Sequence, residues 1–586
     1  MTVLQALDGY YHRMAKRGEA EPQGYSSEKI SFTIVLSAEG KPLRKHDLRE
    51  KSGRRLVPRL LEVPAAVKRT AGVSSNLFWD KTSYVFGRTV GEGRRTAEEH
   101  AAFKKANLDL IEGSNDEGLV AFRRFLEEWV PSRFDEPPFE PDMLDTNIVF
   151  ALDGDLRRLD ECEAARRLIE ARIGGGTDLR MCLVTGVEAP VARLHRPIKG
   201  VEGAQTAGAA LVSFNLDAFK SYGKDQGDNA PTSEAAAFRY GAALNRMLDR
   251  GSRNRLPRPL GDAAVVFWAD TSDAVDEAAA AAAEDIFAEL VEPPPTDAEE
   301  AAQIRDALEK LAAGRPVSDI DPRLVPGTRF HVLGLSPNAA RLSVRYWLSD
   351  EFETFARRLA AHYADLRIEP VPWARPPSVN FLLVKTTALQ EKFDNIPPLL
   401  AGEVMRAVLT GSAYPRTLLA NAVIRLRAGD NPGTGWHAAI IKACLSRIPT
   451  QRTPPVALDP DDPSSAYQLG RLFAVLEAAQ YAALGRVNAS IADRFYGAAS
   501  ATPARVFGTL MRGAKVHISD AKKRNLGGWI EPRIEQIMAH LPAQLPASFK
   551  VEDQGRFAIG YYHERGQRRV RGEATDNAET VKQEDC

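Results

Sequence analysis

The sequence predicts an α+β protein, with a large mixed N-terminal domain of sheets with helical inserts, followed by an all-α helical bundle. Short apolar runs bounded by turn residues predict strands, and they fall between residues 30 and 347. Residues 385–541 instead show the apolar spacing of helices almost throughout. The proline-rich segment EPVPWARPPS, residues 369–378, separates the two patterns. We therefore expect an α+β domain over 1–375, a bundle over 376–545 and a polar, flexible tail over 546–586.

The elements of the first domain are expected as alternating short helices and strands. Strand patterns occur within 30–43, where a Glu-Gly turn follows, and at 146–152, 181–186, 209–215, 263–269 and, as a pair, 329–347. Helical patterns occur at 1–18, 96–130 (two helices), 161–173, 233–249 and, broken by three prolines, 273–313. In the second domain, YQLGRLFAVLEAAQ (467–480) places four large apolar residues on one face, the spacing of a bundle helix.

Composition indicates a globular protein without a disulfide framework. The chain has 586 residues, 44% of them apolar, and a net charge of −1. Its four cysteines are scattered and form no CxxC pair, which argues against disulfides and a zinc ribbon and favours a reducing cytoplasm. The N-terminus has no signal-peptide apolar core, and no apolar run approaches the length of a membrane span. We expect no cofactor and no membrane association.

Searches for catalytic motifs leave no convincing active site. The sequence has no P-loop, no GxGxxG, no HExxH and no GxSxG pattern. His46 and Asp47 resemble half of a metal phosphohydrolase site, but no second cluster accompanies them, and a solvated turn is the preferred interpretation. Cys182 and His195 are better explained as a buried thiol and a hydrogen-bonded imidazole than as a catalytic pair. The chain is therefore expected to bind rather than to catalyse.

Two segments concentrate positive charge although the whole chain is nearly neutral. Residues 41–69 hold ten lysines and arginines against three acids, Asp47, Glu50 and Glu62. Residues 502–525 hold six cations against Asp520 alone. Cation clusters without matching acids are typical of surfaces that bind nucleic acid or another polyanion.

A third candidate surface is the segment AALVSFNLDAFKSYGKDQGDNAPTS, residues 209–233. Lys220 and Lys224 supply cations, and glycines at 223 and 227 let backbone amides approach phosphates. Tyr222 can stack on a base, and Gln226 can read a base edge or a sugar. The alternative is local structure: Asn215 and Asn229 as turn caps, and Ser233 as the N-cap of the following helix.

Three segments together resemble a known family. They are RTAGVSSNLFWDKTSYVFG (69–87), the long block from CLVTGVEAP to FRYGAALN (182–245), and YQLGRLFAVLEAAQYAALGRVNASIADRFYGAASATPARVF (467–507). They resemble the large subunit of the type I-C Cascade, the CRISPR-associated interference complex, and the similarity runs to about residue 545. The C-terminal bundle resembles the Cascade small subunit.

The resemblance implies a non-catalytic role inside a ribonucleoprotein. Such a subunit recognises the protospacer-adjacent motif (PAM) in duplex DNA, aids duplex opening and R-loop formation, and helps recruit the helicase-nuclease. The implied partners are CRISPR RNA, target DNA with its displaced strand, backbone subunits and the subunit that processes the RNA and holds its 5′ end. A separate small subunit can arise by internal translation of the same gene. Protein that reads only a short motif needs basic grooves and no catalytic acid or base.

The residues expected to contact nucleic acid fall into three groups. On the PAM side they are Ser75, Asn76 and Lys81, with Arg54, Arg55 and Arg59 on phosphates. In the central block they are Lys199, Lys220, Lys224 and Gln226. In the bundle they are Arg416, Arg425, Arg427, Arg505 and Arg512, along the displaced strand. Phe78 and Trp79 are candidate wedges at the opening step, with core packing preferred for both.

Two other functions remain open at this point. One is a nuclease with a divergent metal site near His46 and Asp47. The other is a purely structural assembly subunit whose basic segments meet acidic protein partners.

Overall fold

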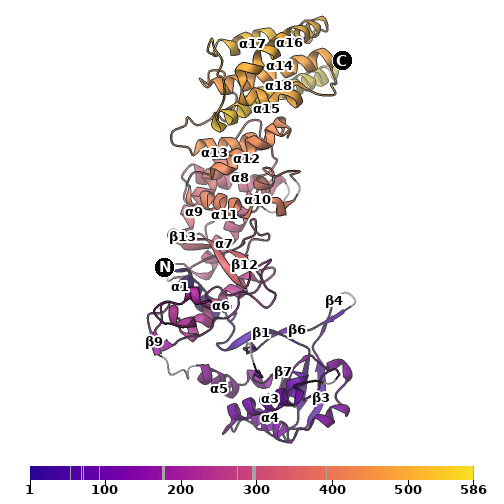
Figure 1. Ribbon diagram of the computed structural model, residues 1–586, viewed down its shortest axis with the longest axis vertical. Coiled ribbons are helices and arrows are strands. Elements are labelled where there is room, and N and C mark those ends of the chain that lie inside the picture. Colours follow the sequence, from indigo (N-terminus) through magenta and orange to yellow (C-terminus); the bar gives the residue numbers. More distant parts are fainter. Residues whose placement is uncertain are drawn as a thin grey trace. The chain divides into compact units, whose positions relative to one another are not determined.

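The protein, a computed structural model, divides into two compact units (Figure 1). The first unit contains Met1–Lys199 and Thr206–Arg246, and the second contains Gly200–Gln205 and Met247–Cys586. The structure describes all residues except 53–54, 68, 70–71, 92, 174–178, 273–274, 294–297, 391 and 585–586. The mixed fold class is confirmed, with small sheets in the N-terminal half and helices dominating the C-terminal region. The boundary expected at 375/376 falls inside the second unit.

A four-stranded sheet forms the centre of the first unit, in the order β3-β2-β8-β7. Its strands are β2 (Phe32–Leu36), β3 (Pro42–Asp47), β7 (Asp80–Lys81) and β8 (Asn147–Leu152). Only β2 and β8 run parallel. Side chains of β2 and β8 share a core, rich in phenylalanine, with three helices: α2 (Thr82–Val85), α3 (Thr96–Ile111) and α4 (Glu117–Glu128). The apolar spacing that predicted two helices within 96–130 is confirmed.

A two-stranded ribbon extends from this sheet. Strand β1 (Tyr25–Ile30) precedes β2 and pairs with β6 (Arg59–Pro64), and β4 (Glu50–Ser52) pairs with β5 (Arg55–Val57). Figure 1 shows β1, β6 and β4 along this ribbon. Beneath it, Ile30, Val63, Trp79 and Val149 form a small separate core. Much of the basic segment 41–69 therefore lies on β-strands.

Helices and turns complete the first unit. They include α1 (Val3–Lys16), α5 (Glu163–Ile173), α6 (Glu234–Leu248) and a short ribbon of β9 (Leu179–Met181) with β10 (Glu188–Pro190). The strands expected at 181–186 and 209–215 are wrong. The first segment turns directly after β9, and in the second Ala209 makes one isolated bridge to Ile198. Buried Cys182 accepts a hydrogen bond from Ser233 N–H at 3.2 Å, so this apolar run packs as a loop.

The second unit begins with a three-stranded antiparallel sheet in the order β11-β12-β13. Its strands are β11 (Ala264–Ala269), β12 (Arg329–Asn338) and β13 (Arg341–Glu351), as expected from the sequence. Aromatic side chains of β11 and β12 meet Phe287 of α7 (Glu277–Val291) and Phe352 and Phe355 of α9 (Phe352–Leu366). Helix α8 (Ala298–Ala312) is the second half of the predicted insert, and it packs against α9.

Helices make up the rest of the second unit. They are α10 (Val379–Val384), α11 (Pro398–Thr410), α12 (Arg416–Arg427), α13 (Trp436–Ser446), α14 (Ser465–Leu484), α15 (Ile491–Ala501), α16 (Pro503–Lys523), α17 (Ile530–Met538) and α18 (Val551–Glu584). Leu469, Leu472, Phe473 and Leu476 of α14 are fully buried, as their spacing predicted. These helices share one continuous core with β11, β12 and α9, which is why the expected boundary does not divide the unit.

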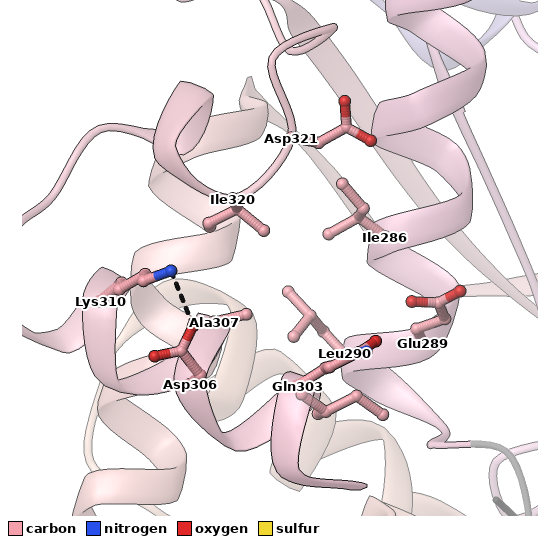
Figure 2. Close-up of a pocket in the computed structure, with 10 residues that line it drawn as sticks. Ile286, Glu289, Leu290, Gln303, Asp306, Ala307, Lys310, Ile320 and Asp321 are labelled. Carbon is pink, nitrogen blue, oxygen red and sulfur yellow. Dashed lines mark ion pairs between the residues drawn. The ribbon is translucent and has the colours of Figure 1, made fainter. Parts of the chain in front are cut away.

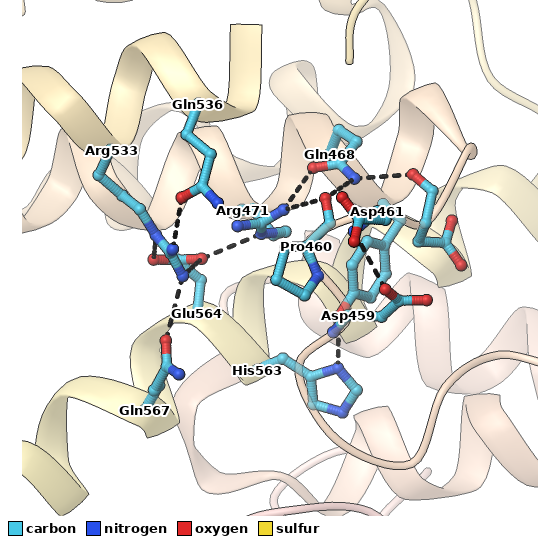
Figure 3. A network of polar contacts seen from close by, with 12 residues as sticks. Asp459, Pro460, Asp461, Gln468, Arg471, Arg533, Gln536, His563, Glu564 and Gln567 are labelled. Carbon is cyan, nitrogen blue, oxygen red and sulfur yellow. Dashed lines mark hydrogen bonds and ion pairs between the residues drawn. The ribbon is translucent and has the colours of Figure 1, made fainter. Parts of the chain in front are cut away.

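The expected flexible tail over 546–586 is wrong for its first half. Helix α18 begins at Val551, and Phe557, Ile559 and Tyr561 are buried against the bundle. Polar residues of this helix are buried too, and Glu564 lies between Arg471 and Arg533 (Figure 3). The segment looked like a tail in the sequence because its charged residues resemble surface residues, whereas they form ion pairs inside the bundle.

Buried histidine-tyrosine pairs make stability depend on pH. His362 Nδ1 lies 2.6 Å from the Tyr414 hydroxyl, and His563 Nδ1 lies 2.8 Å from that of Tyr467. Burial lowers the pKa of each imidazole to about 3. Below the ordinary pKa of about 6.5 the unfolded chain therefore binds more protons than the folded chain, and folding stability falls as pH falls.

We expect each of these two histidines to remove about 2 kcal/mol of unfolding free energy between pH 7 and pH 5. Urea unfolding at both pH values measures the difference. In the His362→Asn variant, the difference in unfolding free energy between pH 7 and pH 5 should be smaller by about 2 kcal/mol than in the unmodified protein. An unchanged difference in this variant would show that His362 does not titrate on unfolding.

Candidate nucleic-acid interface

The loop from Ser74 to Asp80 is held by buried polar groups. Asp80 is buried, pairs with Arg69, and accepts hydrogen bonds from the backbone N–H groups of Asn76 and Lys81, both at 2.9 Å. Asn107 of α3 accepts from Phe78 N–H at 2.7 Å, where the backbone has a φ of 63°. Burial raises the pKa of the Asp80 carboxyl, and its hydrogen-bond donors and Arg69 oppose that effect. The loop therefore has a fixed conformation that ends at Lys81.

Two of the residues expected on the PAM side make hydrogen bonds that hold this loop in place. Ser75 and Asn76 are buried, the Ser75 hydroxyl donates to Ala102 O at 3.3 Å, and Asn76 Oδ1 accepts from Val67 N–H at 2.9 Å. Phe78 and Trp79 are buried as well, and Trp79 Nε1–H donates to Pro64 O, so core packing of both is confirmed. In this conformation the loop does not present these side chains to a ligand.

Lys81 is exposed at the point where the loop Ser74–Asp80, called the clamped loop, meets the sheet. It is registered opposite Asn147 on β8, and Asn147 Nδ2 donates to Lys29 O on β1 at 2.8 Å. Lys29 is exposed too. Neither ammonium group lies within ion-pairing distance of a carboxylate in the part of the chain that the structure describes. The junction of β1, β7 and β8 therefore carries two lysines whose charge is not neutralised.

Distant acids neutralise part of the basic segment 41–69. Arg44 pairs with Asp153, Lys45 with Glu140, and Arg49 with both Asp47 and Asp142. The prediction that this segment lacks matching acids is therefore wrong for its first strand. The sequence could not reveal it, because three of these acids lie about ninety residues or more further along the chain.

The ribbon carries cations of this basic segment that have no close ion pair with a described carboxylate. Lys51 and Arg55 are exposed and, among described residues, have no ion pair, whereas Arg59 lies 3.8 Å from Glu50. Arg54, another residue expected to bind phosphate, lies outside the described residues. Lys51, Arg55 and Arg59 thus place three described cations of the segment on β4, β5 and β6.

The loop before α6 separates into structural and exposed residues. Asn229 Oδ1 accepts from Ser221 N–H, its Nδ2 donates to Lys224 O and Gln226 O, and the Ser233 hydroxyl accepts from Ala236 N–H. The turn-capping interpretation of Asn229 and the N-cap interpretation of Ser233 are confirmed. Tyr222 is 97% exposed.

The four residues of the central block expected to bind nucleic acid differ in whether they form ion pairs with nearby carboxylates. Lys220 pairs with Asp217 and Asp225, and their hydrogen bonds raise its pKa. Lys199 lies 3.6 Å from Glu28. Lys224 is exposed and has no ion pair among the described residues, and Gln226 is half-buried with a φ of 45°. Lys224 is therefore the cation of this group that is best placed to meet a phosphate.

In the bundle, two of the five expected arginines form ion pairs with carboxylates of this chain. Arg425 forms a bidentate pair with Asp430, and Arg416 pairs with Glu552 of α18 at 2.7 Å. Arg427, Arg505 and Arg512 are exposed, and none has an ion pair with a described carboxylate. Arg505 and Arg512 stand seven residues apart on α16, so they lie on one face of that helix.

The side chains of both candidate catalytic pairs have hydrogen-bond partners within the protein. Arg44 Nε–H donates to His46 Nε2 at 3.3 Å, and Asp47 is bound by Arg49. His195 Nδ1 is 2.6 Å from the Tyr240 hydroxyl, while Cys182 accepts from Ser233 N–H. Within the described ranges, no group of three His, Cys, Asp or Glu side chains is arranged to hold a metal ion.

Lys29 and Asn147 are residues of the candidate interface that the sequence did not single out. The signal for Lys29 was weak: it lies in SSEKI, just before the predicted strand. Its proximity to Lys81 depends on β1, β7 and β8 meeting, which no local pattern reveals.

The comparison with protein families decides what kind of protein this is. The family model described as CRISPR-associated protein (Cas_Csd1) matches residues 7–569. The chain belongs to the Cas_Csd1 family. Because the match covers nearly the whole sequence, it confirms the resemblance to the large subunit of the type I-C Cascade and identifies a CRISPR-associated Cascade subunit. No curated protein matches the chain. Among the helices that the structure describes, none combines the length and apolar composition needed to cross a membrane.

Proposed function

We propose that this Cas_Csd1 protein is the non-catalytic subunit that recognises the PAM in duplex DNA for a CRISPR RNA-guided complex. In this role it helps to open the duplex, stabilises the R-loop and helps to recruit the helicase-nuclease for antiviral defence. Its proposed partners are CRISPR RNA, the backbone subunits, the subunit at the RNA 5′ end and a small subunit, which can come from internal translation of the same gene.

The observation that carries this proposal is a pair of exposed lysines without an ion pair among the described residues: Lys81, where the clamped loop Ser74–Asp80 ends, and Lys29 on the neighbouring strand β1. Lysine ammonium groups bind phosphates and guanine acceptors, and a site held rigid before binding loses little entropy when it binds. Lys51 and Arg55 extend the positive charge along the ribbon. These cations support contact with duplex DNA, and an acidic protein partner is the competing occupant.

Charge reversal at the junction tests the proposal. We expect the double variant Lys29→Glu, Lys81→Glu, assembled with the other Cascade subunits and CRISPR RNA, to bind PAM-containing duplex at least tenfold more weakly. The slope of log K against log salt should become shallower by about 1 for each lost phosphate contact. Fluorescence anisotropy across a salt series measures both.

Lys105→Glu is the matched control, because Lys105 is an exposed lysine of α3 in the same unit, without an ion pair to a described residue. It should leave binding nearly unchanged. Normal assembly of the double variant with unchanged DNA affinity would contradict the proposal and favour a purely structural subunit.

We also propose that Arg427, Arg505 and Arg512 contact the displaced strand. The Arg505→Glu, Arg512→Glu variant should leave the affinity for duplex that is not unwound nearly unchanged and shorten the lifetime of the R-loop several-fold, because fewer cations hold single-stranded phosphates. Permanganate footprinting of the displaced strand over time measures the lifetime. An R-loop lifetime equal to that of the unmodified complex would contradict this assignment.

A further inference from the structure

The tip of the loop before α6, residues 221–224, is held by hydrogen bonds within the loop. Lys224 N–H donates to Ser221 O at 3.0 Å and closes the turn. Asn229 holds both ends of the tip, since its Oδ1 accepts from Ser221 N–H at 3.0 Å and its Nδ2 donates to Lys224 O at 3.1 Å. The tip is therefore ordered by the protein itself, and a ligand that binds it would order little further backbone.

Tyr222 occupies this tip in a backbone conformation that large side chains rarely adopt. Its φ of 52° lies in the left-handed region, where a Cβ atom crowds the neighbouring carbonyl oxygen. Tyr222 is also 97% exposed, so packing against the rest of the protein does not compensate for the strain. Strained residues are concentrated at functional sites, where the strain holds a side chain ready for its ligand. The exposed ring of Tyr222 is therefore a candidate contact surface.

The same tip carries hydrogen-bond donors that have no partner among the described residues. These are the backbone N–H groups of Tyr222 and Gly223 and the exposed ammonium group of Lys224. Apart from its chain neighbours, no described atom lies within 4 Å of the position that a Cβ would take at Gly223, so a ligand can approach the backbone there. Backbone N–H donors and an ammonium group on consecutive residues suit a phosphate.

The carboxylates of this loop are bound by other cations and do not neutralise Lys224. The ion pairs are those of Asp217 and Asp225 with Lys220, at 3.1 and 2.8 Å, and of Asp228 with Arg180, at 3.6 Å. The hydrogen bond and charge of Lys220, and then the charge of Arg193, lower the pKa of Asp225. The positive charge of Lys224 therefore remains available to an anion.

Charge pairing distinguishes this tip from the pocket between α7 and α8, which has a volume of about 500 Å³ (Figure 2). The ammonium group in the lining of the pocket, that of Lys310, points to Asp306, with Nζ and Oδ2 2.7 Å apart. Arg323 binds Asp321 of the lining from outside it. These charges satisfy one another and indicate no ligand, whereas the Lys224 ammonium does.

We propose that the loop tip binds one unpaired nucleotide of a single-stranded nucleic acid, with its base on the Tyr222 ring. The adjoining phosphate binds the Lys224 ammonium and the N–H groups of Tyr222 and Gly223. Aromatic rings stack on bases of any sequence, and only a base that has left its duplex offers its face to such a ring. A nucleotide engages the ring and the phosphate donors together, which a single protein side chain does not.

The inference rests on the proposed function, because it requires that the chain works in a complex with CRISPR RNA and target DNA. It adds a site for an unpaired strand to the duplex contact at Lys29 and Lys81. CRISPR RNA outside the heteroduplex and the displaced DNA strand both offer unpaired nucleotides, and the chemistry of the tip suits either.

Photocrosslinking in the assembled complex tests the site and identifies the strand. The full-length chain with p-benzoylphenylalanine in place of Tyr222 is assembled with the other Cascade subunits, CRISPR RNA and PAM-containing DNA, and is then irradiated. Each strand is radiolabelled in turn, and primer extension maps the crosslinked nucleotide. We expect a crosslink to CRISPR RNA or to the displaced DNA strand, at a nucleotide that is unpaired in the complex. A crosslink to protein alone or to paired nucleotides alone, or no crosslink, would overturn the proposal.

The same probe in place of Leu156 is the matched control. Leu156 is fully exposed in the same unit, and the adjoining Arg157 is neutralised by Asp155. Its crosslink to nucleic acid should be at least about fivefold weaker than that of the probe at 222. Lys224→Glu, added to the probe at 222, should lower the yield by a similar factor because a carboxylate repels the phosphate. An unchanged yield would overturn the phosphate contact.

Natural side chains test the stacking. Tyr222→Ala should make the mapped nucleotide at least about fivefold more reactive to a reagent that modifies unstacked bases, and Tyr222→Trp should keep it protected. Equal reactivity with Tyr222→Ala and with the unmodified chain would overturn the stacking. Lys29 and Lys81 are unmodified in these experiments, so the two proposals fail separately: normal DNA binding by the Lys29→Glu, Lys81→Glu variant would contradict the duplex contact alone.

Discussion

Gly560→Ala is expected to destabilise the second unit by at least about 2 kcal/mol, although alanine is ordinarily the better helix former. A Cβ atom at Gly560 of α18 would overlap the backbone carbonyl oxygen of Tyr467 on α14. Gly470 of α14 meets the Phe557 carbonyl oxygen in the same way. Because both obstacles are backbone atoms in packed helices, the strain cannot be relieved by turning a side chain, and α14 and α18 must separate.

Gly513→Ala is the control, because it should raise the unfolding free energy where Gly560→Ala lowers it. Gly513 is exposed in α16, and a Cβ there would have no neighbour within 4 Å. This substitution should stabilise the protein by up to about 1 kcal/mol, since it removes the conformational freedom of glycine from the unfolded chain. Urea unfolding followed by circular dichroism compares the two variants. If Gly560→Ala stabilised the protein as Gly513→Ala does, the close crossing of α14 and α18 would be wrong.

Periodic apolar spacing predicted most helices and the long strands of this chain. It identified α3, α4, α6, α14 and the strand pair β12 and β13. Helix α4 buries one face and exposes the other, whereas β12 and most of α14 are buried on all sides. The apolar spacing failed at 181–186 and 209–215, where short apolar runs are accommodated in loops. A run of four to six apolar residues indicates burial without specifying the backbone conformation.

Helix α18 was missed for a different reason. Arg556, His563 and Glu564 are buried in it, and sequence reasoning assigns such residues to the surface. Their burial is possible because partners on other elements satisfy them: Arg556 Nη2 donates to Gln451 and to the Arg452 carbonyl, and His563 lies beside Tyr467. Long-range polar partners leave no periodic signal in the sequence.

The candidate interface was predictable as a region but not residue by residue. The composition of 41–69 and the residue types in 74–89 pointed to the part of the chain that holds Lys81 and the ribbon. The sequence does not show that Asn76 would be used to fix the loop, since an amide suits a backbone partner and a base edge equally well. Nor does it show that Arg49 would be neutralised by Asp142, which a connection of more than ninety residues brings to it.

Glu564→Gln is expected to cost about 3–5 kcal/mol of unfolding free energy, because it breaks a buried ion network from its centre. The Glu564 carboxylate binds Arg471 Nε at 3.0 Å and Arg533 Nε at 2.7 Å (Figure 3). Arg471 is fully buried, and its other contacts are the Pro460 carbonyl and Gln468, both neutral. A neutral amide at 564 would therefore leave a guanidinium charge inside the bundle without a counterion.

A double variant that removes both buried charges tests whether the lost stability comes from an unpaired guanidinium or from lost side-chain packing. The double variant Arg471→Met, Glu564→Gln should recover most of the stability lost in Glu564→Gln, since the arginine that needs a counterion inside the bundle is gone while Arg533 remains near the surface. Asp520→Asn, which breaks an exposed pair with Lys523, should leave the urea midpoint unchanged. If the double variant were less stable than Glu564→Gln, the cost would come from lost side-chain packing and not from an unpaired charge.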